Sequence, residues 1–263
     1  MSERPLQAHE RISAAIRRST AAGRTALVPF ITAGYPRKDE FIATVRAIAE
    51  EADVVEVGVP FSDPMADGVT IQRASHAAIA SGVSLRWILA ELGKAAPFDA
   101  PIVLMSYLNP LLNFGYEQLA AAALPAGACG FIVPDLPIEE SDEFCAALEA
   151  RGLALIQLVT PTTSPERLKM LCAASRGFVY AVTSTGITGS GKELPAGVGS
   201  YLVQVRALSS LPVCAGFGVR RAEQVRSLAP HTDGVIVGSA LVEQLESGAD
   251  PVAFLRTLRP TLP

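Results

Sequence analysis

The sequence predicts an α/β protein, a (β/α)₈ TIM barrel that forms a single domain over residues 1–263, with an extra N-terminal helix and additional short helices. Eight short apolar runs alternate with helical patterns, and such strands form parallel sheets through right-handed crossovers. Hydrophobic residues make up 49% of the chain and charged residues 18%, a balance that favours strands buried on both faces. No change of composition marks a linker between domains.

The first helix and the strands are predicted as follows. A helix over 9–22, with Ile12 and Ile16 on one face, precedes the first strand and is expected to cover part of the barrel. Apolar runs rich in β-branched residues predict strands, since such side chains fit a pleated surface. The eight strands are expected over 26–32, 53–59, 101–107, 129–133, 153–159, 178–182, 212–215 and 234–237.

The intervening helices follow from apolar residues spaced three and four apart, which share one helix face. Ser84 and Ser164 are expected to cap two of these helices, because a hydroxyl accepts from the free N–H groups of the first turn. The segment 108–115 is predicted to be a loop. Helices are predicted over 38–51, 71–80, 84–95, 116–124, 138–150, 165–174, 201–208 and 221–229, with a final helical region from 239.

An open, doubly wound sheet is the alternative architecture for this alternation. A dinucleotide-binding sheet carries G-x-G-x-x-G directly after its first strand. Here the first strand is followed by Ala33-Gly34-Tyr35-Pro36, which does not fit that pattern. Eight strand–helix units over this length favour the closed barrel.

Charge and composition exclude several classes of function. The net charge of −4, with no basic run, argues against nucleic acid as a partner. No apolar stretch is long enough to span a membrane, and no signal peptide opens the chain, so a cytoplasmic protein is expected. Three scattered histidines give no metal-binding spacing, so no metal is expected. The four cysteines form no C-x-x-C pair and are expected to be buried, reduced thiols: Cys129, Cys145, Cys172 and Cys214.

Glu56 is the most unusual residue of the second strand. Val55, Val57 and Val59 share one face of this strand, and Glu56 lies on the other. A buried carboxylate without a partner is costly and usually has a raised pKa, which suits proton transfer near neutral pH. The alternative is a structural role, in which Glu56 caps a neighbour or pairs with a Lys or Arg.

The loop that follows supplies further carboxylates. The strand breaks at Pro60, and Asp63 and Asp67 follow in a loop that prolines and Gly68 shape. Two carboxylates in different environments are the arrangement that acid–base chemistry needs. Glu56 and one of these two loop carboxylates therefore form a candidate catalytic pair.

Three glycine-rich clusters follow the last three strands: Thr188-Gly189, Gly216-Phe217-Gly218 and Gly238-Ser239. In a barrel all of them reach the C-terminal rim, where the loops after strands 7 and 8 commonly bind phosphate. Glycines let a ligand approach the backbone, and N–H groups at a helix start attract an anion. Together the clusters predict a phosphorylated small-molecule ligand.

A near match to a P-loop lies in the loop 183–199. Gly186 to Lys192 fits the glycine and lysine positions, but Glu193 replaces the hydroxyl residue that binds Mg²⁺. Leu194 and Pro195 then follow where a P-loop begins a helix. Nucleotide binding is not expected, and the length and composition of the loop suit a lid over the site.

Aromatic and apolar residues near the same rim have two interpretations. Tyr180, Phe30 and Phe217 either line a pocket at the barrel mouth or pack in the core. The apolar segment 108–115 either docks a partner or folds over the barrel edge.

These motifs resemble the tryptophan synthase α subunit family over nearly the whole chain, from Val28 to Ala240. The run from Glu56 to Gly68 is the most specific, and Val133 to Pro137, Gly186 to Gly189 and Gly216 to Gly218 add to it. The resemblance implies a barrel lyase that splits indole-3-glycerol phosphate into indole and glyceraldehyde 3-phosphate. It implies no cofactor and no metal, and a pyridoxal-phosphate-dependent β subunit as partner in an α2β2 complex.

The resemblance also implies roles for individual residues. Glu56 resembles the general acid–base, and Asp67 the carboxylate that holds the indole N–H. The implied substrate-binding residues are Phe30, Ile71, Tyr107, Tyr180, Phe217 and the lid residue Thr188. The implied phosphate-binding residues are Gly189, Gly218, Gly238 and Ser239, and the implied contacts to the β subunit are Asp63, Pro64, Asn109 and Pro110.

Two positions depart from the family pattern. Val69 stands where proline is frequent, which suggests a less rigid loop after Asp67, and Ser184 stands where some relatives have arginine. Two other functions are alternatives: a sugar-phosphate isomerase or epimerase that shares the phosphate site, and a non-catalytic subunit that activates a partner. The intact pair of Glu56 and Asp67 argues against the latter.

Overall fold

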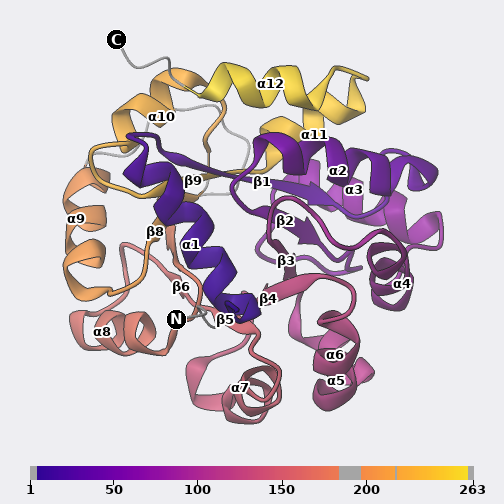
Figure 1. The fold of residues 1–263 in the computed structure, drawn as a ribbon, viewed down its shortest axis with the longest axis horizontal. Helices are drawn as coiled ribbons and strands as arrows, with labels where there is room; N and C mark the ends of the chain where they lie inside the picture. Colours follow the sequence, from indigo (N-terminus) through magenta and orange to yellow (C-terminus); the bar gives the residue numbers. More distant parts are fainter. Residues whose placement is uncertain (1–4, 184–196, 217, 260–263) are drawn as a thin grey trace.

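The computed structural model describes residues 5–183, 197–216 and 218–259, and within them one parallel sheet closes into a barrel (Figure 1). The strand order is β5-β4-β3-β2-β1-β9-β8-β7-β6. Strand bounds are β1 Ala26–Thr32, β2 Val55–Gly58, β3 Ile102–Met105, β4 Ala128–Ile132, β5 Ala154–Ile156, β6 Leu158–Val159, β7 Val179–Val182, β8 Val213–Gly216 and β9 Gly234–Val237. The predicted barrel is thereby confirmed.

The two ends of the sheet meet in one stretch of chain, predicted as the single strand 153–159. The structure divides it at Gln157 into β5, which pairs with β4, and β6, which pairs with β7. At the break the Gln157 N–H donates to Ser175 Oγ at 3.0 Å, and the Gln157 carbonyl accepts from Tyr180 N–H at 3.0 Å. These bonds keep the backbone satisfied where the ladder changes partners.

Helices surround the strands (Figure 1). None of the helices within the described ranges has the length and apolar character needed to cross a bilayer. The α-helices are α1 Ala8–Ala21, α2 Phe41–Glu51, α3 Val69–Ala80, α4 Leu85–Ala95, α5 Leu108–Phe114, α6 Tyr116–Ala123, α7 Asp142–Glu149, α8 Pro165–Ala174, α9 Val198–Leu208, α10 Ala222–Leu228, α11 Ser239–Glu246 and α12 Pro251–Leu258. Short 3₁₀ turns, Lys38–Glu40 and Ile138–Glu140, lead into α2 and α7.

The segment predicted as a loop over 108–115 is instead helix α5. Its first N–H, that of Leu108, donates to Asp135 Oδ1 at 2.8 Å. Pro110 lies in the first turn, where its missing N–H removes no intrahelical bond. Leu111 is fully buried beneath the helix. The cap from Asp135 and the burial of Leu111 therefore stabilise a helix that the local sequence does not predict.

Helix α1 covers the N-terminal end of the barrel, as predicted. His9 N–H donates to the Gly152 carbonyl at 2.9 Å, and Ser13 Oγ donates to the Gly177 carbonyl at 2.5 Å. Ile12 and Ile16 are fully buried. Because Gly152 and Gly177 precede β5 and β7, this end of the barrel is closed and the opposite rim is left for ligands.

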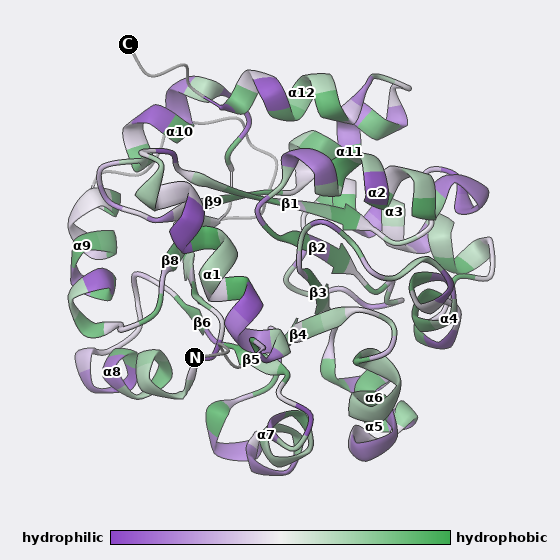
Figure 2. Ribbon diagram, viewed as in Figure 1, coloured by the Kyte–Doolittle hydropathy of each residue, from purple (hydrophilic) through white to green (hydrophobic). Residues whose placement is uncertain are grey.

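The core lies between the barrel strands and the surrounding helices, and the strands are the most apolar elements in Figure 2. All seven residues of β1 are buried, as expected for a strand covered on both faces. Phe30 of β1 is in register with Glu56 of β2. This pairing places an aromatic ring and a carboxyl side by side at the same level of the barrel.

Candidate active site

A cavity opens at the C-terminal rim of the barrel, and it brings together residues far apart in the sequence. Eight of the predicted site residues line it: Phe30, Glu56, Asp67, Ile71, Tyr180, Gly218, Gly238 and Ser239. Five further residues that were not predicted complete the lining: Met105, Val219, Arg220, Ile236 and Ala240. Carboxyl groups, apolar walls and a glycine-rich corner therefore face one space.

Glu56 lies on β2 with its side chain inside the barrel mouth. Only 1% of its surface is exposed, and Oε2 makes no hydrogen bond within the described residues. Burial, with the nearby Asp67 as a second cause, raises the pKa of Glu56 to about 8. The group is therefore mostly protonated at neutral pH and able to give up its proton during a reaction. No Lys or Arg pairs with it within the described residues, so the structural alternative finds no support.

Asp67 lies in the loop between β2 and α3. Its Oδ2 accepts from the Tyr107 hydroxyl at 3.2 Å, and the loop backbone is held because Gln72 Nε2 donates to the Asp67 carbonyl at 2.9 Å. Burial raises the pKa of Asp67 to about 6, and the Tyr107 bond opposes this rise. Asp67 is therefore mostly ionised at neutral pH, when Glu56 is mostly protonated.

Tyr107 was predicted to bind substrate, but it does not line the Glu56 cavity. Its hydroxyl donates to Asp67 and accepts from the Ala66 N–H at 2.8 Å, and its ring stacks on Phe61 at 5.0 Å. It lines a smaller adjoining cavity that shares Asp67, Phe30 and Ile71 with the first. Tyr107 thus positions Asp67 and holds the loop that carries it.

The apolar walls of the cavity depend on two glycines. A Cβ on Gly58 would lie 2.4 Å from Phe30 Cζ, and one on Gly216 would lie 2.5 Å from Tyr180 Cε1. Each ring therefore occupies the space above a glycine of the neighbouring strand. Phe30 also packs in one apolar cluster with Ile71, whereas Tyr180 belongs to the main core.

The glycine-rich corner lies at the start of α11. Gly238 precedes the helix, and the first intrahelical bonds are donated by Leu241 and Val242 to the Gly238 carbonyl. The N–H groups of Ser239 and Ala240 come before those bonds, so they face the cavity end of the helix without intrahelical acceptors. Gly218 has φ +88°, which favours glycine, and open space above its Cα. This corner is suited to a phosphate group.

Several predicted site residues lie outside the described residues. They are Thr188 and Gly189, the rest of the proposed lid over 184–196 including Ser184, and Phe217. Their predicted roles remain predictions. Val69 is described: it is the first residue of α3 and is exposed.

The residues expected to meet a β subunit lie on the outside of the same rim. Asp63 and Asn109 are exposed, Pro110 is half-buried, and Pro64 is buried. Asn109 and Pro110 line a surface groove together with Arg86 and Phe114. Exposed apolar side chains lie nearby in sequence: 83% of Met65 and 53% of Leu112 are accessible.

Of the unpredicted lining residues, only Arg220 carried a signal in the sequence. It follows the Gly216-Phe217-Gly218 cluster after a barrel strand, which is a position for functional side chains. Met105 and Ile236 are ordinary apolar strand residues, and their sequence does not distinguish a cavity wall from the core. Among the residues described, no group of three or more His, Cys, Asp or Glu is placed to hold a metal ion.

Comparison with known proteins agrees with this geometry. The family model described as "Tryptophan synthase alpha chain" matches residues 16–256. This chain belongs to the tryptophan synthase alpha chain family. The alpha chain of Nitratidesulfovibrio vulgaris (strain DP4) is 44% identical over 248 residues, 94% of this chain and 96% of that one. The alpha chain of Desulfovibrio desulfuricans is 46% identical over 244 residues, 91% and 96% of the two chains.

Solved structures give the same result. A Mycobacterium tuberculosis tryptophan synthase structure has a TM-score of 0.88 and 39% identity, covering 94% of this chain and 96% of that one. The alpha subunit from Legionella pneumophila str. Paris has a TM-score of 0.84 and 35% identity, covering 94% and 96%. The family membership confirms the predicted lyase function of the α type. These relatives give no support to an isomerase, an epimerase or a non-catalytic subunit.

Proposed function

We propose that this chain cleaves indole-3-glycerol phosphate to indole and glyceraldehyde 3-phosphate, with Glu56 and Asp67 as its catalytic groups. The observation that carries the proposal is one cavity with a protonated carboxyl, an ionised carboxyl, apolar walls and a phosphate corner. The four features match four parts of the substrate: the protonated carboxyl matches C3 of the indole, the ionised carboxyl the indole N–H, the apolar walls the ring, and the glycine-rich corner the phosphate.

Glu56 supplies and recovers the proton of the retro-aldol step. Its protonated carboxyl transfers a proton to C3 of the indole ring, which leaves positive charge on the ring nitrogen. The resulting carboxylate then removes the proton of the side-chain hydroxyl next to the ring. The bond between C3 and the side chain breaks, its electrons return to the ring, and the hydroxyl carbon becomes the aldehyde. Glu56 ends protonated, so one group serves as acid and base.

Asp67 stabilises the charge that develops between these proton transfers. Its carboxylate accepts a hydrogen bond from the indole N–H. Its negative charge therefore lies beside the nitrogen on which positive charge develops. Tyr107 fixes this carboxylate by a hydrogen bond of 3.2 Å. Phe30, Ile71 and Tyr180 provide the apolar surface against which the indole ring packs.

The phosphate is held at the glycine-rich corner of the cavity by Gly218, Gly238 and Ser239. The start of α11 directs N–H groups and the positive end of its dipole toward the anion. Gly189 is proposed to complete this corner, Phe217 to contact the substrate, and Thr188 to close over the site beside Asp67.

We further propose a cytoplasmic α2β2 complex with a pyridoxal-phosphate-dependent β subunit. The rim around Asp63, Pro64, Asn109 and Pro110 is the proposed contact surface. Its support is the exposed apolar surface of Met65 and Leu112 beside these residues. The cytoplasmic location is supported by the four cysteines, all of which are free thiols.

Indole release from indole-3-glycerol phosphate by the purified chain tests the proposal. Glu56→Gln keeps the shape of the side chain but cannot transfer the proton, so turnover should fall by about 10²- to 10⁴-fold. Glu139→Gln is the matched control, because Glu139 is an exposed partner of Arg167 and does not line the cavity. Near-normal turnover by Glu56→Gln would remove Glu56 from the mechanism, and no release by the unaltered chain with a β subunit present would overturn the function.

A further inference from the structure

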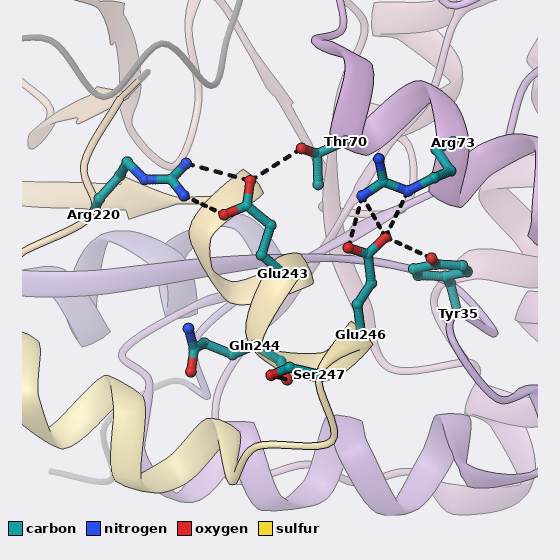
Figure 3. A network of polar contacts seen from close by, with 8 residues as sticks. All are labelled: Tyr35, Thr70, Arg73, Arg220, Glu243, Gln244, Glu246 and Ser247. Carbon is teal, nitrogen blue, oxygen red and sulfur yellow. Dashed lines mark hydrogen bonds and ion pairs between the residues drawn. The ribbon is translucent and has the colours of Figure 1, made fainter.

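Arg220 is a charged residue of the cavity to which the mechanism above gives no role. It follows Gly218 and Val219 after β8 and lines the cavity with Gly218, Gly238 and Ser239. Its guanidinium forms an ion pair with Glu243 of α11, and its side chain is 27% exposed (Figure 3). The pair lies one helical turn from the N–H groups that the phosphate corner offers.

The acidic groups of the cavity and the substrate phosphate would repel one another, so a positively charged side chain nearby would favour substrate binding. Glu56 and Asp67 both contribute carboxyl groups, and the proposed substrate brings a phosphate of charge close to −2. Among the lining residues that the structure describes, Arg220 is the one basic side chain. A guanidinium presents paired N–H donors in a planar fork, which fits phosphate oxygens as well as it fits a carboxylate.

Glu243 has a second partner that remains if Arg220 leaves. Thr70 Oγ1 donates to Glu243 Oε1 at 3.1 Å, from the first turn of α3 (Figure 3). Glu243 is also partly exposed to water, with 31% of its side chain accessible. The carboxylate therefore stays hydrogen-bonded and solvated without the guanidinium, which keeps the cost of exchange low.

We infer that Arg220 is a phosphate-binding residue. Its guanidinium leaves Glu243 when substrate binds and pairs with the phosphate at the corner formed by Gly218, Gly238 and Ser239. This inference rests on the proposed function for the identity of the ligand. Arg220 acts on binding alone, since it lies at the phosphate end of the cavity and not among the proposed proton-transfer groups. Its loss therefore raises KM and leaves kcat nearly unchanged.

A second arginine–glutamate ion pair that involves α11 provides a matched control. Arg73 of α3 pairs with Glu246 of α11 at 2.7 Å, and Glu246 also accepts from Tyr35 at 2.6 Å (Figure 3). Arg73 does not line the cavity. Arg73→Ala thus removes an arginine–glutamate pair from α11 without removing a cavity cation.

Binding of glycerol 3-phosphate, measured by calorimetry, tests the inference without turnover. Arg220→Ala should weaken binding by about 10- to 100-fold, the usual effect of losing a hydrogen bond to a charged group. Arg220→Lys should recover part of the loss, and Arg73→Ala should bind like the unaltered protein. Glu243→Gln removes the competing carboxylate and should bind at least as tightly.

Weaker binding by Glu243→Gln, or equal binding by Arg220→Ala, would overturn the exchange. Equal losses in Arg220→Ala and Arg73→Ala would assign the effect to helix packing and also overturn it. Failure of the unaltered protein to bind glycerol 3-phosphate would count against the phosphate corner and Arg220 together.

Turnover then separates this inference from the proposed function. We expect the protein to cleave unphosphorylated indole-3-glycerol only slowly; Arg220→Ala should leave that rate unchanged while raising KM for indole-3-glycerol phosphate. Equal losses with both substrates would show that Arg220 does not act through the phosphate. If the unaltered protein binds glycerol 3-phosphate but releases no indole, the proposed function fails while the binding results still decide the role of Arg220.

Discussion

Glu56 and Asp67 share one cavity but hold their protons differently, because their surroundings differ. Glu56 is almost fully buried without a hydrogen-bond partner for Oε2, whereas Asp67 is partly exposed and accepts from Tyr107. The pKa is raised to about 8 for the first and about 6 for the second. Between these values one carboxyl is an acid and the other an anion, which is the division of labour that the retro-aldol step needs.

The raised pKa of Glu56 predicts a pH-dependent loss of stability. The folded chain keeps a proton on Glu56 up to about pH 8, while the unfolded chain releases it near the ordinary value of 4.5. The folded state therefore binds more protons, and its stability falls as pH rises through this window. Glu56→Gln has no group that ionises at this position. Its free energy of unfolding, relative to that of the unaltered protein, should therefore increase between pH 4.5 and about 8.

Urea unfolding of both proteins at several pH values between about 5 and 9 measures this difference. The advantage of Glu56→Gln in free energy of unfolding should level off once the pH exceeds the folded-state pKa of Glu56. A constant difference across the range would mean that Glu56 is not protonated in the folded protein.

Tyr107→Phe is predicted to shift the pH profile of the enzyme. The Tyr107 hydroxyl lowers the pKa of Asp67, so its removal should raise that pKa further. The acidic limb of kcat/KM should then move to higher pH, because Asp67 must be ionised to stabilise the indole cation. Tyr116→Phe is the control, since Tyr116 stacks on Phe144 outside the cavity. An unmoved limb in Tyr107→Phe would separate Asp67 ionisation from catalysis.

At the scale of the element, β2 carries the proposed catalytic carboxyl and also a glycine above which the Phe30 ring packs. Gly58→Ala would bring a Cβ within 2.4 Å of Phe30 Cζ, so the ring must move into the cavity. We expect a stability loss of about 1–3 kcal/mol and weaker substrate binding. Thermal unfolding and KM measure the two effects.

Gly93→Ala is the matched control for this substitution. Gly93 lies within α4, where an added Cβ makes only ordinary contact, 3.7 Å from Ala126 Cα. Alanine there should increase stability by up to about 1 kcal/mol, because it favours the helix. A Gly58→Ala protein as stable and active as Gly93→Ala would show that Phe30 has room to move.

The elements also show what the sequence was able to predict. Periodicity predicted the strands and most helices, because apolar spacing reports which faces are buried. It failed at α5, where the helix depends on a bond from Leu108 N–H to Asp135, 27 residues away. It also missed the break at Gln157, which only the change of strand partners explains.

The same limit applies to the site. Glu56 stood out because a carboxyl is rare in a buried strand, and Gly238 because a glycine followed by a serine links a strand to a helix. The hydrogen bond that makes Tyr107 a support for Asp67 joins residues 40 positions apart, so spacing could not reveal it. Met105 and Ile236 line the cavity because their side chains lie on the strand face that points to it, and their residue types do not reveal that face.

At the scale of the whole molecule, the two ends of the barrel have separate tasks. At the N-terminal end Asp53 accepts from Leu27 N–H at 2.8 Å and pairs with Arg259 at 3.3 Å, while α1 covers the opening. At the C-terminal end lie the cavity and the exposed apolar residues of the proposed partner surface. Changes at the first end should alter stability, and changes at the second should alter catalysis and assembly.

A pair of leucine substitutions tests this division. Leu112 lies on α5 at the C-terminal rim, 53% exposed, and Leu124 lies between α6 and the start of β4 at the opposite end, 42% exposed. We expect a β subunit to raise the rate of indole release, and Leu112→Asp should reduce this rise because it places a charge in an apolar contact. Leu124→Asp should leave that rise intact.

Titration of each variant with a β subunit, read as the rate of indole release, measures the effect. Both variants should match the unaltered chain when no β subunit is present, since neither residue lines the cavity. Loss of the partner response in Leu124→Asp alone would place the contact at the other end of the barrel. An equal response in all three chains would exclude α5 from the contact surface and direct attention to the loop around Asp63 and Met65.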